Sequence, residues 1–138
     1  MPTIKELKKK NCKIVILSHF GRPKGSYNKK MSLRSIIPKF EETAKEKIYF
    51  SKDYKGKNLE NLIRRVVNGS IIVMENTRFY KGEEKNFKYF AKDLSKCCDF
   101  FVNDAFSVAH RSHASVIGLT NFVPVSYTHL TLPTNTPV

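Results

Sequence analysis

Short apolar runs alternate with amphipathic segments along the first hundred residues of the chain. Uninterrupted Ile, Val and Leu character within residues 13–18 and 70–75 predicts strands that are buried on both faces, as in a parallel sheet. Shorter strands are predicted at residues 48–51 and 99–103. Because strands and helices alternate, the pattern predicts an α/β fold in which helices cover both faces of a Rossmann-like parallel sheet, giving three layers.

Apolar residues three and four positions apart predict the intervening helices. The clearest pattern covers residues 59–67 and ends before an Asn-Gly pair, which favours helix termination. Residues 33–40 show the same spacing behind Ser32, a good N-cap, although Pro38 falls in the early turns of this helix. Weaker helical patterns cover residues 4–12 and 87–94.

Three of the predicted strands lead into loops that contain Arg and His. The loops have the sequences HFGRPKG, ENTRF and NDAFSVAHRSHAS. In parallel α/β sheets, ligands bind at the carboxyl ends of the strands, so we expect the three loops to meet at one edge. Guanidinium groups pair with phosphate and carboxylate in a planar, two-pronged geometry, and the predicted pocket therefore suits a small anion. The basic candidates for this pocket are Arg22, Arg78, Arg111, His19 and His113.

Each loop has a simpler interpretation when it is taken alone. The His-x-Gly-Arg-Pro segment after the first strand is more typical of an ordinary turn. Arg78 follows a strand end, and Glu83 or Glu84 offers a carboxylate for an ion pair. Asp104 is interpreted as a residue that holds loop backbone through hydrogen bonds. The sequence contains neither a P-loop pattern nor a GxGxxG pattern, so neither kind of nucleotide-phosphate loop is predicted.

Composition favours a globular protein in a reducing environment. The chain has 138 residues, 41% of them hydrophobic, which allows one domain with a substantial core. No apolar run approaches the roughly 18–20 residues that span a bilayer, and the lysine-rich start lacks the apolar segment of a secretory signal. Three cysteines, an odd number without metal-binding spacing, favour a cytoplasmic setting.

The net charge of +13 has two interpretations. A basic surface of this kind is the electrostatic signature of nucleic-acid binding. It is also typical of a solvated, lysine-rich surface, and we favour that interpretation because neither a helix-turn-helix nor an aromatic strand face is evident. A small basic α/β module that binds nucleic acid or phosphate groups is kept as the alternative hypothesis.

The three loop sequences resemble the signature segments of the amino-terminal domain of phosphoglycerate kinase, in matching order and spacing from about residue 2 to residue 124. The third segment, NDAF followed by AHR and HAS, is the most specific. The departures from the family pattern, at Phe20, Thr77 and Ser107-Val108, remove no charged group. The expected fold is therefore the Rossmann-like parallel α/β sheet of this amino-terminal domain, in incomplete form.

The resemblance implies a glycolytic enzyme that transfers a phosphoryl group between 1,3-bisphosphoglycerate and Mg-ADP, giving 3-phosphoglycerate and ATP. It assigns no catalytic residue and no metal ligand to this chain, because the Mg-ATP or Mg-ADP site belongs to a separate carboxyl-terminal domain. It implies small-molecule substrates, a monomeric full-length enzyme, and neither a nucleic-acid nor a membrane partner. The substrate-binding residues that it implies are His19, Phe20, Gly21, Arg22, Arg78, Arg111 and His113.

Both ends of the sequence differ from the family pattern. The resemblance implies an opening strand with an Asp and an Asn before residue 1 and further sequence after residue 124, so we expect a fragment of low stability that is inactive alone. Residues 125–138, VSYTHLTLPTNTPV, contain no Lys, Arg, Asp or Glu. This segment resembles a translated sequencing adapter, and we hypothesise that it is foreign to the protein. A natural flexible tail is the alternative.

Overall fold

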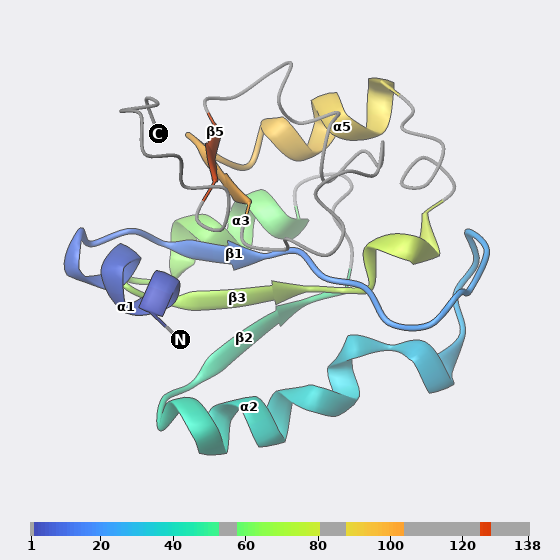
Figure 1. Ribbon diagram of the computed structural model, residues 1–138, viewed down its shortest axis with the longest axis horizontal. Coiled ribbons are helices and arrows are strands. Elements are labelled where there is room, and N and C mark those ends of the chain that lie inside the picture. Colours follow the sequence, from blue (N-terminus) through green and yellow to red (C-terminus); the bar gives the residue numbers. More distant parts are fainter. Residues whose placement is uncertain (1, 53–57, 81–87, 104–124, 128–138) are drawn as a thin grey trace. The chain divides into compact units, whose positions relative to one another are not determined.

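The computed structural model describes residues 2–52, 58–80, 88–103 and 125–127 of the chain (Figure 1). The chain divides into two compact units, Met1–Lys81 and Gly82–Val138, and each unit is described by itself. The first unit contains two of the three loops that the sequence singles out.

A three-stranded parallel sheet forms the centre of the first unit. Its strands are β1 (Ile14–Ile16), β2 (Ile48–Ser51) and β3 (Ile71–Met74), and their order across the sheet is β1-β3-β2. All four residues of the middle strand β3 are buried. The uninterrupted apolar run of this segment reflects that position, because a middle strand covered on both faces has no side exposed to water. The predicted parallel α/β sheet is confirmed.

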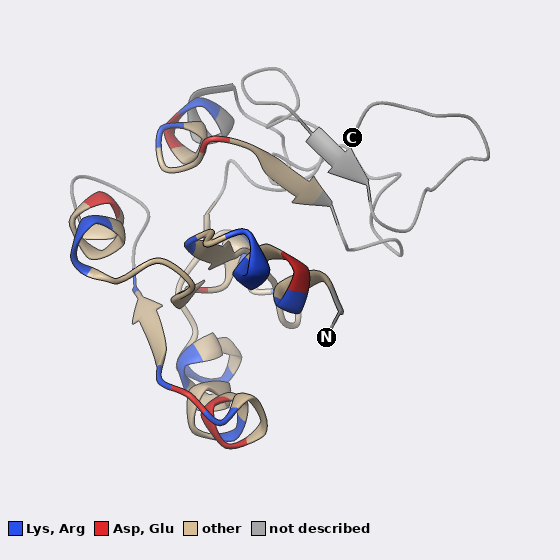
Figure 2. Ribbon diagram, turned by 90° about the vertical axis from the view of Figure 1, so that its left-hand side faces the viewer, with Lys and Arg blue, Asp and Glu red and all other residues tan. Residues whose placement is uncertain are grey.

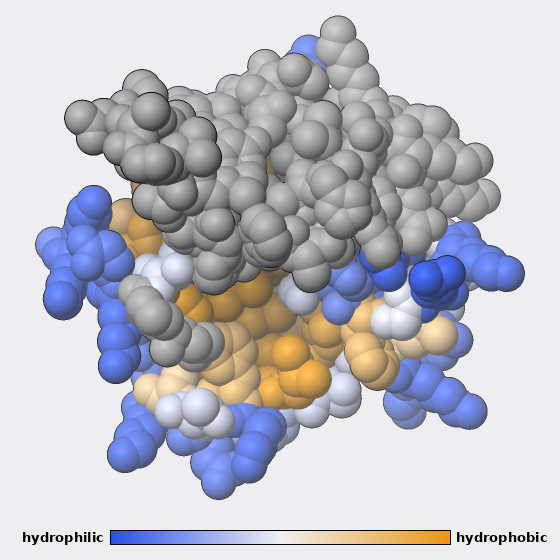
Figure 3. Space-filling model, in the orientation of Figure 1, coloured by the Kyte–Doolittle hydropathy of each residue, from blue (hydrophilic) through white to orange (hydrophobic). Residues whose placement is uncertain are grey.

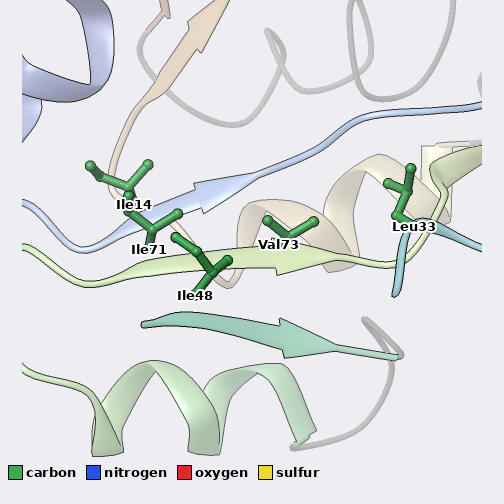
Figure 4. Packing of buried hydrophobic residues seen from close by; sticks show 5 residues of the cluster. All are labelled: Ile14, Leu33, Ile48, Ile71 and Val73. Carbon is green, nitrogen blue, oxygen red and sulfur yellow. The ribbon is translucent and has the colours of Figure 1, made fainter. Parts of the chain in front are cut away.

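The strand register aligns apolar residues in rows across the sheet, as the close view of the core shows (Figure 4). One face carries two such rows, which consist of Ile14, Ile71 and Ile48 and of Ile16, Val73 and Phe50. Because side chains alternate between the faces of a sheet, Ile72 and Met74 belong to the opposite face. Both of these side chains are 0% exposed, so β3 is fully covered on each side.

Helices cover the two faces of this sheet. Residues of α1 (Pro2–Lys9) and α2 (Ile37–Ala44) pack against the cluster on the face of Ile71 and Val73. The third helix, α3 (Asn58–Arg65), lies on the other side of β2 from α2 (Figure 2). Leu59 of α3 is completely buried, as its place in the predicted apolar stripe requires. The first unit therefore has the three layers that the sequence predicts.

The segment before α2 shows why Pro38 is tolerated. Ser32 caps a short 3-10 helix, η2 (Leu33–Ile36), and its side chain accepts a hydrogen bond from the backbone N–H of Arg34 at 3.2 Å. The α-helix begins only at Ile37, which places Pro38 in the first turn, where its missing N–H costs no helical hydrogen bond. The predicted N-cap is confirmed, and the predicted helix consists of two consecutive pieces.

The end of α3 corrects the predicted helix over residues 59–67. The helix ends at Arg65, and Val67 is 75% exposed, although its spacing assigns it to the apolar stripe. Beyond the helix the chain turns through Gly69, which has a φ of 89° and donates its N–H to the carbonyl of Cys12 at 2.9 Å. This turn directs the chain into β3, so Val67 leaves the helix face before the stripe is complete.

Charged residues of the first unit lie on helices and loops, whereas its three strands carry none (Figure 2). On the face seen in Figure 3, apolar surface is bordered by hydrophilic side chains. Among the helices in the described part of the chain, none has the length and apolar character needed to cross a membrane.

The second unit contains one described helix and one pair of strands. Helix α5 (Lys88–Ser95) and strand β4 (Phe101–Asn103) confirm the elements predicted at residues 87–94 and 99–103. Strand β4 pairs in parallel with β5 (Val125–Tyr127), which lies in the uncharged segment 125–138. Phe101 is opposite Val125 in this ladder.

Candidate functional site

The loop after β1 has a tightly turned backbone. Three of its residues, Gly21, Lys24 and Gly25, have positive φ angles of 66°, 58° and 81°. A methyl group added at Gly21 would lie 2.9 Å from the Sδ atom of Met31, so this position favours glycine both for its φ angle and for lack of space. The loop then reaches a short 3-10 helix, η1 (Lys29–Met31), before Ser32.

The predicted ligands in this loop differ in exposure. Phe20 is 56% exposed and Arg22 is exposed, whereas His19 is half-buried. Pro23, directly after Arg22, is buried and fixes the chain at that point. The guanidinium of Arg22 is thus accessible to a solute while its backbone is held by a buried neighbour.

The loop after β3 is buried, in contrast to the first loop. Residues Glu75 to Phe79 are all buried, and the last three of them form the 3-10 helix η3 (Thr77–Phe79). Asn76 caps this helix, because its Oδ1 atom accepts a hydrogen bond from the backbone N–H of Arg78 at 3.0 Å. Arg78 itself is only 7% exposed.

Hydrogen bonds join the two loops directly. The Nη1 atom of Arg78 donates to the carbonyl of Gly21 at 3.1 Å, and the N–H of Gly25 donates to the carbonyl of Arg78 at 3.1 Å. The N–H of Thr77 also donates to the carbonyl of Ser18 at 3.0 Å. Both loops lie at the edge where β1 and β3 end (Figure 1). The expectation that these two loops meet at the carboxyl edge of the sheet is confirmed.

An aromatic contact adds to this junction. The rings of Tyr27 and Phe79 meet edge to face, with centroids 5.2 Å apart and planes inclined by 65°. Tyr27 is 67% exposed, whereas Phe79 is buried, so the first loop covers the helix that carries Arg78. The loops are therefore held together by both polar and apolar contacts.

The third predicted loop falls outside the described residues. It follows β4, which ends at Asn103, and it contains Arg111 and His113. Glu83, Glu84 and Asp104 also lie outside the described residues. The convergence of all three loops, and an ion pair of Arg78 with either glutamate, therefore stay predictions.

The structure reveals two residues at this edge that the sequence analysis did not single out. Glu75 and Asn76 are 5% and 0% exposed and make several hydrogen bonds to the segment between β1 and α2. The signal available in the sequence is a carboxylate and an amide placed directly after four apolar strand residues. Polar groups that end a buried strand need partners from other segments, because burying them without hydrogen bonds is unfavourable.

The described residues contain no group of three or more His, Cys, Asp or Glu side chains that could hold a metal ion. What they do contain is a parallel α/β sheet with an exposed arginine and a buried arginine on joined loops at its carboxyl edge. The chain is therefore an α/β domain with a parallel sheet, a class of protein in which small ligands bind at the carboxyl ends of the strands.

Comparison with known proteins identifies the family. A family model described as phosphoglycerate kinase matches residues 1–132. The phosphoglycerate kinase of Allorhizobium ampelinum is 49% identical over 123 residues, which cover 89% of this chain and 31% of that protein. The phosphoglycerate kinase of Borrelia garinii is 44% identical over 124 residues, which cover 90% of this chain and 32% of that protein. The chain therefore belongs to the phosphoglycerate kinase family, as its motifs indicated.

Solved structures agree with this assignment. The phosphoglycerate kinase of Coxiella burnetii superposes with a TM-score of 0.78 at 34% identity, covering 91% of this chain and 31% of that one. The enzyme of Pyrococcus horikoshii superposes with a TM-score of 0.79 at 30% identity, covering 92% of this chain and 33% of that one. The chain thus spans about a third of the length of these relatives. The family model extends past residue 124, where the resemblance read from the motifs ends.

Proposed function

We propose that this chain supplies part of the 3-phosphoglycerate-binding region of a phosphoglycerate kinase. The reaction would be the transfer of a phosphoryl group from 1,3-bisphosphoglycerate to ADP, which gives 3-phosphoglycerate and ATP. Membership of the family supports the reaction class. The basic loops at the carboxyl edge of the sheet support a role in binding the anionic substrate.

One observation carries this proposal: the hydrogen bond from Arg78 Nη1 to the carbonyl of Gly21. It joins two of the three motif loops through residues on which the proposed site depends. Arg22 follows Gly21 directly, so the contact also fixes the backbone from which the exposed guanidinium of Arg22 extends. In the proposed site, Arg22 binds the substrate anion directly, while Arg78 holds the loop and adds positive charge beneath it.

The remaining ligands in the proposal are His19, Phe20, Arg111 and His113, which are assigned by the family motifs. Phosphoryl transfer depends mainly on positioning and on neutralising charge, which suits a site composed of arginine and histidine. Magnesium, when bound with the nucleotide, would offset the negative charge of the nucleotide phosphates. The proposal assigns the magnesium and nucleotide contacts to other parts of the enzyme. It also includes a cytoplasmic location and no turnover by this chain alone.

The test is a calorimetric titration of the purified chain with 3-phosphoglycerate. Arg22→Met should weaken binding about tenfold or more, because a charge-assisted hydrogen bond to the ligand is lost. Arg64→Met is the matched control, since Arg64 is also exposed, lies on α3, and loses the same charge. The control should bind like the unaltered chain.

Four outcomes would contradict the proposal or a part of it. Absence of 3-phosphoglycerate binding by the unaltered chain would remove its basis, and equal losses in the two variants would indicate attraction by net charge alone. Binding to an unrelated DNA duplex that weakens steeply with salt, together with indifference to 3-phosphoglycerate, would favour the nucleic-acid hypothesis. Formation of ATP from 1,3-bisphosphoglycerate and ADP by the chain alone would overturn the predicted lack of turnover.

A further inference from the structure

Asn76 occupies a fully buried position between three segments of the first unit. Its side chain is 0% exposed and lies immediately beyond β3. The Nδ2 atom donates hydrogen bonds to the carbonyl of Phe20 at 2.7 Å and to the carbonyl of Met31 at 3.0 Å. The Oδ1 atom accepts from the N–H of Arg78 at 3.0 Å. The carboxamide of Asn76 thus uses both donor hydrogens and its acceptor oxygen in hydrogen bonds to backbone groups. Such pairing is expected because buried polar groups need hydrogen-bond partners.

These hydrogen bonds complete a ring that contains the proposed ligand loops. From Asn76 the ring passes to the carbonyl of Phe20, along the backbone to Gly21, and from the Gly21 carbonyl to Arg78 Nη1. It returns from the backbone N–H of Arg78 to Asn76 Oδ1. The positions of Gly21 and Arg78 relative to each other are therefore fixed twice, once by their own contact and once through Asn76.

Glu75 holds the end of the segment between β1 and α2, at Ser32 and Leu33. Its Oε1 atom accepts from the backbone N–H groups of Leu33 and Asn76, both at 2.8 Å, and its Oε2 atom accepts from Ser32 Oγ at 2.5 Å. The carboxylate thereby lies at the start of η2, where helical N–H groups favour negative charge. Glu75 and Asn76 together bind the chain on both sides of residue 31 to the end of β3.

We propose that Asn76 is a positioning residue for the phosphoglycerate site. The side chain of Asn76 is hydrogen-bonded to both the carbonyl of Phe20 and the N–H of Arg78. It therefore determines the position of the loop that contains Arg22 relative to the turn that contains Arg78. Its effect on ligand affinity acts through these two arginines, without a contact of its own to the ligand. The inference rests on the function proposed above, because it concerns the same site.

The substitution Asn76→Asp tests whether the donor group of Asn76 positions the loop. Aspartate has nearly the same shape and keeps an acceptor for the N–H of Arg78, but it replaces the donor group by an oxygen that faces two carbonyl oxygens. The loop should move away from Asn76, and the affinity for 3-phosphoglycerate should fall about tenfold or more. Asn61→Asp is the matched control, because Asn61 is exposed on α3 and undergoes the same change in charge. This control should retain the affinity of the unaltered chain.

A pH series separates positioning from general loss of structure. Protonation of the new aspartate at low pH restores one O–H donor, so the affinity ratio between the unaltered chain and Asn76→Asp should narrow as the pH falls from about 7.5 to about 5. The Asn61→Asp control accounts for protonation of the ligand over the same range. A ratio that is independent of pH, or an Asn76→Asp variant that binds like the unaltered chain, would overturn the inference and leave the proposed function intact.

A measurement on the unaltered chain covers the case in which Asn76→Asp does not fold. The side-chain amide resonances of Asn76, assigned by NMR, should shift when 3-phosphoglycerate is added, because the ligand acts on loops that share its hydrogen bonds. Resonances that stay unchanged while the ligand binds would refute the role of Asn76. Absence of ligand binding by the unaltered chain would instead refute the proposed function, and the inference with it.

Discussion

Replacing Gly21 by alanine tests whether the loop after β1 depends on its left-handed turn. Gly21 has a φ of 66°, a conformation that costs a residue with a Cβ atom roughly 1–2 kcal/mol. The added methyl would also lie 2.9 Å from Met31 Sδ and 3.3 Å from its Cγ and Cε atoms, so the methionine side chain must move. We expect Gly21→Ala to lower the free energy of unfolding by roughly 1–3 kcal/mol in total.

A second glycine allows the two contributions to be separated. Gly69 has a φ of 89°, but a methyl group there would meet nothing within 4 Å. Gly69→Ala should therefore report the backbone strain alone, and the additional loss in Gly21→Ala should report the crowding at Met31. Combining Gly21→Ala with Met31→Ala should recover this additional loss, which a double-mutant cycle measures as a coupling energy.

Urea unfolding followed by circular dichroism is a suitable assay for all four variants. With a slope of about 1–3 kcal/mol per molar urea, a loss of about 1 kcal/mol shifts the midpoint by roughly 0.3–1 M. A loss in Gly21→Ala no larger than the loss in Gly69→Ala would refute the crowding argument. A coupling energy near zero between positions 21 and 31 would refute it independently.

Two further predictions concern the core and the cysteines. Ile72 lies in the middle strand and its side chain is 0% exposed, so Ile72→Ala should lower the free energy of unfolding by about 2–5 kcal/mol. The side chain of Val67 is 75% exposed, so Val67→Ala should change this free energy by no more than about 0.5 kcal/mol. Similar urea midpoints for the two variants would contradict this burial pattern. Burial, with a smaller contribution from Asp99, raises the pKa of the Cys98 thiol, so in a Cys97→Ser background iodoacetamide should alkylate Cys98 slowly at pH 7.5, and Asp99→Asn should accelerate the reaction. Because the pKa of the Cys98 thiol is higher in the folded chain, the contribution of this thiol to stability is present at neutral pH and is lost as the pH rises above the ordinary thiol pKa of about 8.5. Mass spectrometry measures the rate at which Cys98 is alkylated. An Asp99→Asn variant that is alkylated no faster would contradict the role of Asp99.

The sequence predicted the sheet well because its signals are local. The apolar run that becomes β3 is uninterrupted, and the predicted strand at residues 48–51 has the bounds of β2. The end of helix α3 was predicted less well. The position of Val67 depends on the turn at Gly69 and on the hydrogen bond from Gly69 to Cys12, which is far away in the sequence. Local periodicity contains no information about such a partner.

The site was predicted in part, for a similar reason. The arginine-containing loops were evident from their motifs and from the rule that strand ends carry ligands, and the contact between Gly21 and Arg78 agrees with that rule. The hydrogen bond of Asn76 to Phe20 is not evident from the sequence, because Phe20 is 56 residues away and is contacted through a backbone carbonyl. A carbonyl is present at every residue, so the sequence does not mark which one is used.

The strand order β1-β3-β2 also has a consequence for synthesis of the protein on the ribosome. Strand β1 is made first, but its neighbour in the sheet is the last of the three strands to be made. Gly21 and Arg78, which join the two loops, are 57 residues apart. At about 5–20 residues per second, the nascent chain carries the first loop for roughly 3–11 s before its partner exists. During this interval β1 has no β3 to pair with, and chaperones that bind apolar nascent segments have time to reach it.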